Sequence, residues 1–574
     1  MPAENDFKKL VDGVDYVAFD VYDTAVVRPF RRPTDLFRYM EGATGREGFA
    51  ESRIEAEKRA RRKLRKEVTL DEIYSFLPGE FKDLKNEEIQ TEISLTRADR
   101  KFVLANDYAR RRGKKILMVS DMYFPRNVIA EVLTKLNIDY DYLYVSNDCW
   151  RTKHDGSMYD YILEDRGIAS PHRLLMVGDN RRSDYEMPKR KGISVYRWIP
   201  LTERYGREYP AECRYGKRGI DESVLMGTDM LMWQDGLEGG YWDRLGRSYG
   251  GPMALQFALH IADCAESADR ILFLSRDAYN VWKVYDRFCG NLGKKPVPSA
   301  YIHISRMLVK ALAYKGDGDR DSLESVFEYL RRTGEAKKLG IPAVSESWEH
   351  ERIFRERKTD VLSKTAEAEK RYGRYLKSRT EGCENILLVD TTTMRFTTQR
   401  FLTDRIPGIT GCYYAVTGKS NLPHTAYCNR SEDRLTYSLV NFAEYCFSSG
   451  EPPICDIDAN GEPVYSESSW QEMSHTEQAD RMLGGELQYC DFVCGLYGEP
   501  PKLSGKAVDG WCELLFSRER RGNDPSRLSG AVWAVNTQHT EFLHVVLRGS
   551  DLAKIVKMKA GSLLWKVRRP YWRQ

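Results

Sequence analysis

Five short apolar segments, each ending at or next to an acidic or hydroxyl residue, constrain the fold of this chain more than any other feature. Segments of this length and composition are typical of strands that are buried on both faces of a parallel sheet. The stretches between them are helix-like, so the predicted fold class is α/β. Ligands of such sheets bind beyond the carboxyl ends of the strands, where the polar residues lie. The five segments are Tyr16–Asp20, Ile116–Ser120, Leu174–Gly178, Ile271–Ser275 and Ile386–Asp390.

The length of the chain, 574 residues, exceeds what one hydrophobic core usually supports, so at least two domains are expected. We predict a first domain over residues 1–204, a linker over 205–215 and a second α/β domain over 216–545. Residues 33–105 have a charged, helix-like composition with few strand signals. They are predicted to form a helical cap inserted into the first domain.

The composition narrows the class of protein. With 41% hydrophobic and 30% charged residues, the chain has enough apolar material to fold and no low-complexity bias. No apolar stretch reaches the roughly 18 residues needed to cross a membrane, and the first residues lack the order of a signal peptide. We therefore expect a cytoplasmic protein. Its 12 cysteines form no CxxC pair, and we expect reduced thiols instead of a zinc site or a disulfide framework.

The last segment, residues 546–574, differs in charge from the rest of the chain. From Asp551 to Gln574 there are seven Lys or Arg residues and one acid, and Trp565 and Trp572 lie among them. Such a segment is expected either to attach the protein reversibly to the anionic inner face of a membrane or to pack as a terminal helix. No nucleic-acid-binding motif accompanies these charges.

Four segments of the first 200 residues place reactive side chains in one distinctive order. In chain order they are Phe19–Thr24 after the first strand, Ser120, Lys153 and Gly178–Asp184. Together they resemble the haloacid dehalogenase superfamily over about residues 10–200. Members of that superfamily have a Rossmann-like core and use an aspartate at the sheet edge as a nucleophile, usually toward phosphate esters. The resemblance therefore implies a hydrolase or phosphotransferase.

The resemblance gives a role to each matching residue. Asp20 would attack phosphorus and form an aspartyl phosphate that is then hydrolysed. The Ser120 hydroxyl would hydrogen-bond a phosphoryl oxygen, and the Lys153 ammonium would balance negative charge. Thr24 and Asn180 are further candidates for binding phosphate.

A magnesium ion is implied at the same edge, because the nucleophile and the phosphate are both anionic and repel each other. Asp20, Asp179 and Asp184, together with the carbonyl of Tyr22, would supply its oxygen ligands. Hydrolases of carbon–halogen bonds in the same superfamily need no metal. The acidic residues therefore favour phosphoryl chemistry, and a haloacid dehalogenase is the weaker alternative.

Tyr22 is a departure from the phosphatase pattern. Phosphatases of this type usually have an aspartate there as general acid and base, a role worth typically ~10²–10⁴ in rate. Three alternatives follow. Asp23 transfers the proton, or the leaving group needs little protonation, as in a phosphoanhydride or glycosyl phosphate, or the site binds without turnover. In the last case the chain is a binding or assembly protein, and activity such as glycosyl or phosphoryl transfer lies in the second domain.

Motifs between Gly251 and Pro453 give the second domain a resemblance of its own. Their order is similar to that in the C-terminal part of two-part bacterial proteins linked with surface-polysaccharide synthesis. The resemblance implies that a phosphorylated sugar or glycan precursor is the substrate.

A hydroxyl-rich turn is predicted where the strand at Ile386–Asp390 ends. Asp390, Thr391 and Thr392 would form a phosphate seat there, with Arg276 as a further contact. The alternative is that Asp390 and the threonines only cap a helix, and that Arg276 makes a local ion pair.

Overall fold

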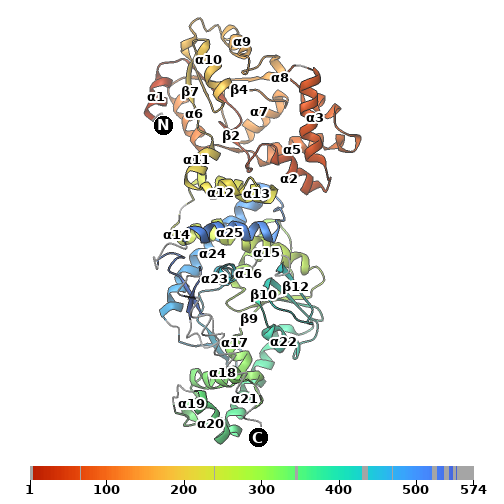
Figure 1. Cartoon of the computed structure of the whole chain (residues 1–574), viewed down its shortest axis with the longest axis vertical. Helices are drawn as coiled ribbons and strands as arrows, with labels where there is room; N and C mark the ends of the chain where they lie inside the picture. The colour runs from red at the N-terminus through yellow and green to blue at the C-terminus, as the bar shows by residue number, and fades with distance from the viewer. Residues whose placement is uncertain are drawn as a thin grey trace. The chain divides into compact units, whose positions relative to one another are not determined.

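The computed structural model describes residues 4–64, 66–237, 239–317, 319–342, 347–429, 437–467, 470–519, 526–534, 542–546 and 551. The chain divides into two compact units, residues 1–238 and 239–574. Each unit is built around a five-stranded parallel sheet (Figure 1). The predicted α/β class is therefore confirmed. Most of the basic segment predicted over 546–574 lies outside the described residues.

The sheet of the first unit has the strand order β5-β4-β1-β6-β7, with β1 at its centre. The inner residues of β1 are fully buried, and Phe19 packs edge-to-face against Phe102 of helix α6 (Arg100–Arg111) at a ring-centroid distance of 5.0 Å. This burial on both sides explains why the segment is apolar up to its last residue. The strands are β1 Tyr16–Asp20, β4 Lys115–Ser120, β5 Tyr142–Val145, β6 Leu174–Gly178 and β7 Ser194–Arg197.

Helices connect these strands, as in other parallel sheets. Met158 and Ile162 of one of them, α9, pack with Leu117 and Met176 of the sheet in a buried cluster. The helices of this core are α1 Glu4–Asp12, α6 Arg100–Arg111, α7 Arg126–Lys135, α8 Ser146–Cys149, α9 Ser157–Asp165, η2 Pro171–Arg173, η3 Arg181–Glu186 and α10 Met187–Arg190.

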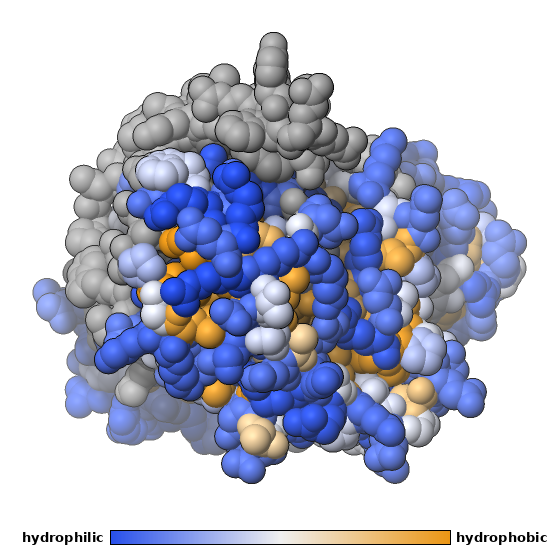
Figure 2. All heavy atoms as spheres, turned by 90° about the horizontal axis from the view of Figure 1, so that it is seen from below, coloured by the Kyte–Doolittle hydropathy of each residue, from blue (hydrophilic) through white to orange (hydrophobic). Residues whose placement is uncertain are grey.

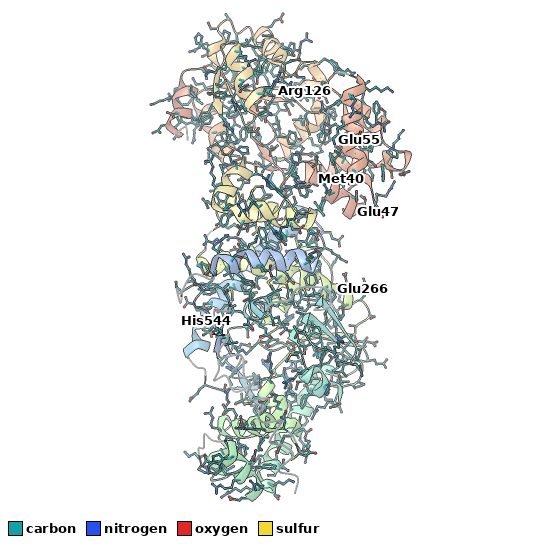
Figure 3. All side chains as sticks on the ribbon, in the orientation of Figure 1. Met40, Glu47, Glu55, Arg126, Glu266 and His544 are labelled. Carbon is teal, nitrogen blue, oxygen red and sulfur yellow. The ribbon has the colours of Figure 1, made fainter. Side chains whose placement is uncertain are left out.

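A helical cap lies between two short strands, β2 (Val26–Val27) and β3 (Arg97–Ala98), which pair antiparallel. Figure 3 marks Glu55 on a cap helix and Arg126 at the start of α7 of the core. The cap was predicted over 33–105, but its last helix ends at Leu95. The next helix, α6, belongs to the core instead, because it packs against β1. The cap helices are α2 Asp35–Thr44, α3 Phe49–Leu64, α4 Leu70–Ser75, η1 Gly79–Leu84 and α5 Lys85–Leu95.

Three helices complete the first unit: α11 (Leu201–Glu208), α12 (Pro210–Tyr215) and α13 (Ile220–Asp235). They occupy the place of the linker predicted over 205–215, and the two units divide after residue 238 instead. The reason is packing. The fully buried Tyr205 donates a hydrogen bond to Asp229 of α13 at 2.6 Å, so an aromatic residue of the expected linker belongs to a core.

The second sheet has the order β12-β11-β10-β8-β9. The chain order of its strands reverses between β8 and β10, so the crevice expected of such a sheet lies at the carboxyl ends of these two strands. The strands are β8 Arg270–Leu274, β9 Ser299–Ile302, β10 Ile386–Thr393, β11 Ile409–Val416 and β12 His424–Asn429. Two separate antiparallel pairs are β13 Ile454–Ile457 with β14 Pro463–Tyr465, and β15 Val532–Ala534 with β16 Phe542–His544.

Helices bury the second sheet in a large apolar cluster that includes Leu272, Leu388 and Phe327. The face of the molecule seen in Figure 2 is mainly hydrophilic, with hydrophobic residues in small separate patches. None of the helices in the described part of the chain combines the length and apolar content that crossing a membrane requires. The helices of this unit are α14 Tyr241–Leu245, η4 Gly246–Gly250, α15 Gly251–Cys264, α16 Tyr279–Asn291, α17 Arg306–Ala313, α18 Arg320–Arg332, α19 Glu335–Lys338, α20 Ser347–Glu356, α21 Lys358–Thr380, α22 Thr397–Thr403, α23 Tyr437–Phe447, α24 Trp470–Tyr497 and α25 Gly505–Glu519.

Candidate active site

The carboxyl edge of the first sheet brings together residues that are far apart in the sequence. Asp20 is the last residue of β1, Ser120 is the last residue of β4, and Asp179 directly follows β6. Because β1 pairs with both β4 and β6, the three strand ends are neighbours. The chain order of the strands reverses between β1 and β6, which is where ligands bind in sheets of this kind.

The side chain of Lys153, 3% exposed, connects two carboxylates of this edge. Its Nζ contacts Asp20 Oδ1 and lies 2.7 Å from Asp184 Oδ1. The carboxylate of Asp121 accepts hydrogen bonds from the backbone amide of Lys153 at 2.9 Å and from the next amide at 3.2 Å. Asp121 therefore holds the loop that carries the lysine. Sequence reasoning missed this residue, although it directly follows the strand that ends in the predicted serine.

Asp20, Asp179 and Asp184 form an acid cluster: each offers a carboxylate oxygen, and these three oxygens lie within 4.8 Å of one another. The Thr24 hydroxyl is 3.4 Å from Asp20 Oδ2 and also 3.4 Å from Asp179 Oδ1. Thr24 was predicted to bind phosphate, and its hydroxyl here joins two members of the cluster.

The position of Asp184 depends on the turn that follows β6. Its Oδ2 accepts a hydrogen bond from the Asn180 amide at 3.0 Å. A Cβ atom on Gly178 would lie 2.4 Å from the same oxygen, so only glycine allows this close approach. The Asn180 side-chain oxygen accepts from the amides of Arg182 and Ser183 and caps the turn.

The charges of the acid cluster are not balanced by protein groups alone. Burial raises the pKa of Asp20 well above its usual range, against the opposing effect of Lys153. Burial, with Asp23 and Asp184, raises the pKa of Asp179 to about 6. Burial by itself would lower the pKa of Lys153, but Asp184 and Asp20 raise it well above its usual range. Three buried or half-buried carboxylates thus share one ammonium.

A tight loop after Asp20 carries the two candidates for proton transfer. Asp23 lies in the left-handed region with a φ of 58°, and its amide donates to the Val26 carbonyl at 2.9 Å. Burial raises the pKa of Asp23. The charge of Asp23 also raises the pKa of Asp179, a member of the acid cluster.

Tyr22 takes part in a different group of side chains. The Arg28 guanidinium lies over the Tyr22 ring at 4.3 Å and binds both carboxylate oxygens of Glu92, on the cap helix α5, at 2.9 and 3.0 Å. Burial, with the nearby Glu92, raises the pKa of the Tyr22 hydroxyl well above its usual range. Tyr22 is therefore a poor proton donor.

Ser120 differs from its neighbours in having an unused hydroxyl. The residue is 2% exposed, and within the described part of the chain no hydrogen bond to its hydroxyl is found. The hydroxyl is therefore available to a ligand at the carboxyl end of β4.

The cap is anchored to the loop that follows β4. Arg53 and Glu88, both fully buried, pair through two hydrogen bonds at 2.7 and 2.8 Å, and the Tyr74 hydroxyl donates to the same carboxylate at 2.8 Å. The Arg53 guanidinium also lies 4.7 Å from the centroid of the Tyr123 ring. Tyr123 lies in the loop after β4, three residues after Ser120. The cap is therefore in direct contact with this loop.

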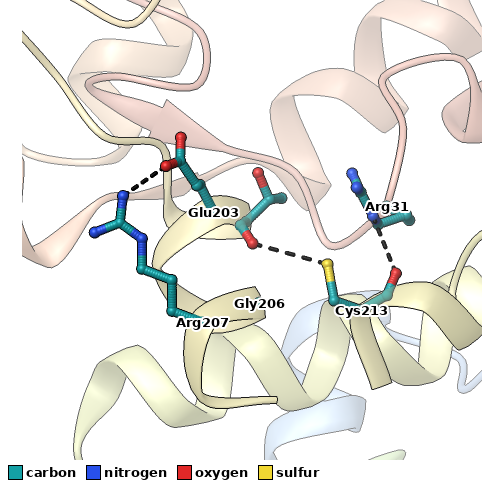
Figure 4. A pocket seen from close by; sticks show the side chains of 6 residues that line it. Arg31, Glu203, Gly206, Arg207 and Cys213 are labelled. Carbon is teal, nitrogen blue, oxygen red and sulfur yellow. Dashed lines mark hydrogen bonds and ion pairs between the residues drawn. The ribbon is translucent and has the colours of Figure 1, made fainter. Parts of the chain in front are cut away.

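A cavity of about 360 Å³ lies elsewhere in the first unit (Figure 4). The guanidinium of Arg31 donates to the Cys213 carbonyl at 3.2 Å, and Arg207 pairs with Glu203 at 2.6 Å. None of the cavity's lining residues belongs to the acid cluster. They are Arg31, Thr202, Glu203, Gly206, Arg207 and Cys213.

The second sheet also ends in a charged group, but its composition differs from the predicted phosphate seat. β10 continues to Thr393, because Thr393 pairs with Val416 of β11, so the turn expected after Asp390 is strand. The Thr391 hydroxyl donates to the Asp277 carbonyl, and the Thr392 hydroxyl donates to Glu444. Both threonine hydroxyls are thus engaged by the protein.

Carboxylates dominate this second group. Burial, with Asp277, raises the pKa of Asp390 to about 7, while Arg306 opposes the shift. Arg306 lies 3.7 Å from Glu444, and the Ser448 hydroxyl donates to Asp277 at 3.2 Å. Sequence reasoning did not bring Asp277 and Glu444 together with Asp390, because they come from separate elements.

Arg276 has a structural part in this edge of the second sheet. Its φ is 65°, its amide donates to the Tyr301 hydroxyl at 2.7 Å, and its carbonyl accepts from the Ser449 amide at 2.9 Å. These backbone contacts fix the loop after β8. A phosphate contact by the Arg276 side chain stays a prediction.

Comparison with known proteins gives a family for part of the first unit. Residues 14–192 match the family of haloacid dehalogenase-like hydrolases, and the resemblance is confirmed for this domain. No curated protein matches the chain. Among solved structures, L-2-haloacid dehalogenase from Xanthobacter autotrophicus is 14% identical, with 34% of this chain and 83% of that chain covered and a TM-score of 0.26. A similarity at this level carries no information about the substrate.

Proposed function

We propose that the haloacid dehalogenase-like domain is a phosphoryl hydrolase or phosphotransferase with Asp20 as its nucleophile. The observation that carries the proposal is the Asp20 carboxylate, buried at the end of the central strand with an ammonium on one oxygen and two further carboxylates beside it. The proposed substrate is a phosphorylated sugar or glycan precursor. That part of the proposal depends on the sequence resemblance of the second domain.

The contacts of Asp20 favour one of its two oxygens as the attacking atom. Oδ1 is held by Lys153, whereas Oδ2 has only the Thr24 hydroxyl at 3.4 Å among the described residues. Oδ2 would form the bond to phosphorus while the ester bond breaks, and water would then cleave the aspartyl phosphate. Lys153 would stabilise the charge of both steps, and the Ser120 hydroxyl would donate to a phosphoryl oxygen.

A magnesium ion fits the acid cluster, because all ligand atoms of the cluster are oxygens. The three carboxylates of the cluster also outnumber the single ammonium group, that of Lys153. Asp20, Asp179 and Asp184, with the carbonyl of Tyr22, would hold it. When bound, it would supply positive charge beside the nucleophile and the phosphoryl oxygens.

Proton transfer to the leaving group is proposed to involve Asp23 and not Tyr22. The raised pKa of Asp23 favours a carboxyl that carries a proton closer to neutral pH, and its charge acts on Asp179. The Tyr22 ring instead packs under Arg28. A substrate such as a phosphoanhydride or glycosyl phosphate, whose leaving group needs little protonation, suits a site with this limited supply of protons.

The test is release of phosphate by the full chain from a panel of sugar phosphates and nucleotide sugars, with Mg²⁺ and with EDTA. Asp20→Asn should lower the rate by roughly 10⁴-fold or more. Asp160→Asn, which changes an exposed carboxylate paired with Lys191, is the matched control and should be unaffected. The proposal fails if no substrate is turned over with Mg²⁺ and if Mg²⁺ with beryllofluoride does not stabilise the chain.

Two further measurements separate the alternatives. Release of halide from a haloacid in EDTA would indicate the dehalogenase reaction. A gain of phosphatase activity in Tyr22→Asp would indicate that the natural site binds without turnover, whereas loss of an existing activity would show that Tyr22 belongs to the working site.

A second candidate function places chemistry at the end of β10. With a pKa of about 7, Asp390 can both donate and accept a proton at neutral pH, as a glycosyl or phosphoryl transferase requires. Reciprocal variants distinguish the two candidates. An activity that survives Asp20→Asn but is lost in Asp390→Asn belongs to the second unit.

A further inference from the structure

Three side chains with soft ligand atoms converge in the second unit, away from its strand ends. His260 and Cys264 lie one turn apart on α15, so they share a face of that helix. Cys412 lies in the middle of β11, opposite Thr425 of β12. The His260, Cys264 and Cys412 ligand atoms all lie within 4.8 Å of one another. These three residues are called the thiol–imidazole site.

The contacts around the site direct the imidazole toward the thiols. His260 Nε2 is 3.7 Å from Cys264 Sγ and 3.1 Å from the Thr425 hydroxyl. The imidazole ring stacks on Phe257 at a centroid distance of 6.4 Å and lies 6.1 Å from the Tyr427 ring. Aromatic rings thus restrict the histidine to one orientation before any ion binds.

We propose that His260, Cys264 and Cys412 bind a zinc-type divalent ion that joins α15 to strand β11 of the second sheet. A tetrahedral zinc ion with bonds of about 2.3 Å to sulfur and about 2.0 Å to nitrogen separates these atoms by about 3.5 Å. The measured 3.7 Å between His260 Nε2 and Cys264 Sγ therefore needs almost no rearrangement.

The ligand set identifies the kind of ion. Thiolate and imidazole prefer zinc and similar soft or borderline metals, and they are poor ligands for Mg²⁺. Cys264 and His260 are half-buried, so solvent or the Thr425 hydroxyl can occupy the fourth position.

Another cysteine pair shows what the histidine adds. Cys490 and Cys494 are also one turn apart on a helix, α24. Within the described residues they belong to no group of three metal-ligating side chains. They serve as an internal control, because they have the same four-residue helical spacing as His260 and Cys264 but no imidazole.

The experiment uses the full chain without a histidine tag, reduced and freed of metal with a chelator that is then removed. Cobalt(II) is the probe, because thiolate ligands give it charge-transfer absorption and a tetrahedral site gives it strong visible bands. One equivalent should bind with both signals, and Zn²⁺ should displace it whereas Mg²⁺ should not. Cys264→Ala and Cys412→Ala should each weaken binding by roughly 100-fold or more, and Cys494→Ala should not.

Alkylation of the wild-type chain keeps the test independent of how the variants fold. Zn²⁺ should protect Cys264 from iodoacetamide, while Cys383, a half-buried thiol that is not part of the site, reports on general reactivity. The proposal is wrong if the reduced chain shows no cobalt–thiolate absorption, if the signal survives the Cys264→Ala/Cys412→Ala double variant, or if mass spectrometry shows Cys264 and Cys412 as a disulfide that excludes metal. Asp20→Asn should keep the cobalt spectrum, so failure here is separate from failure of the proposed phosphoryl chemistry.

Discussion

The two sheets of this protein carry charged groups at corresponding places, the ends of the strands between which chain order reverses, but they neutralise them differently. In the first sheet the cation, Lys153, is 3% exposed and lies between Asp20 and Asp184. In the second sheet the cation, Arg306, has a side chain that is 55% exposed and lies 3.7 Å from Glu444.

The two cations thus differ in solvent exposure: Lys153 is buried, whereas Arg306 is more than half exposed. An exposed pair is screened by water and contributes little to stability, whereas breaking a buried pair leaves an uncompensated charge inside the protein. The first group is thus part of the packed domain. In both groups a carboxyl holds its proton more tightly than usual, because burial raises the pKa of Asp179 to about 6 and that of Asp390 to about 7.

Lys153→Met is the sharpest way to break this comparison. Removing the ammonium leaves buried carboxylates without their partner, and we expect the first unit to lose about 3–5 kcal/mol of unfolding free energy. Hydrogen exchange of β1 amides in increasing urea, with EDTA present, measures this unit separately. Lys191→Met, which removes a more exposed lysine paired with Asp160, is the control and should change little. A loss in Lys153→Met no larger than in the control would mean that the buried pair is not a core contact.

Asp390→Asn tests the second group by pH. The folded chain keeps a proton on Asp390 up to about pH 7, whereas the unfolded chain releases it near pH 4. Wild-type stability therefore falls relative to the variant as pH rises through this window, and levels off above it. We expect an advantage for Asp390→Asn of about 2–4 kcal/mol at pH 8 over that at pH 4, reduced by partial exposure.

The groups facing Asp390 from neighbouring elements are Asp277, Arg306 and Glu444. Chemical denaturation of the wild type and the variant at several pH values measures the difference. A stability difference that is the same at pH 4 and pH 8 would show that Asp390 ionises normally in the folded chain.

Two serines extend the comparison to neutral groups: Ser120 at the end of β4 and Ser275 directly after β8. The Ser275 hydroxyl donates to the Ile304 carbonyl at 2.7 Å and accepts from the Ile304 amide at 2.9 Å. Ser275→Ala should therefore cost about 1–3 kcal/mol, because it leaves buried backbone groups unpaired. Ser120→Ala should cost less than about 1 kcal/mol but should lower the proposed activity. Paired thermal denaturation and phosphate release check both, and equal stability losses would contradict the comparison.

Arg306→Met is expected to have the smallest effect. Its ion pair with Glu444 is long and the Arg306 side chain is more than half exposed, so the unfolding free energy should change by less than about 1 kcal/mol. Denaturation in low and high salt measures it. A loss comparable with that of Lys153→Met would show that the two cations are equivalent after all.

The central strands and the order of the motifs could be predicted from the sequence, because burial on both faces makes β1 and β6 apolar until Asp20 ends the one and Asp179 follows the other. The same argument fails for edge strands. β7 has only one buried position and no apolar run, so no segment was predicted there. Aromatic residues near Tyr205 were predicted to be linker because composition does not show which side chains find a buried partner.

The residues of the site were predictable only where a strand end carried them. Asp20, Ser120 and Asp179 meet because their strands pair. Asp121 and the contact of Tyr22 with Arg28 depend on loop conformation, which has no periodic signal. His260 and Cys412 come from a helix and a strand far apart in the chain, so no spacing pattern in the sequence brings them together.

The pairing of β2 with β3 has a consequence for how this family of domains can diversify. The chain leaves the core at Val26–Val27 and returns beside it at Arg97–Ala98. The two connections between the cap and the core are therefore adjacent. A different insert with neighbouring ends can replace the present one without breaking the central strands. Selectivity for a substrate can then change through replacement of the cap, while Asp20, Lys153 and Asp184 of the core keep their positions.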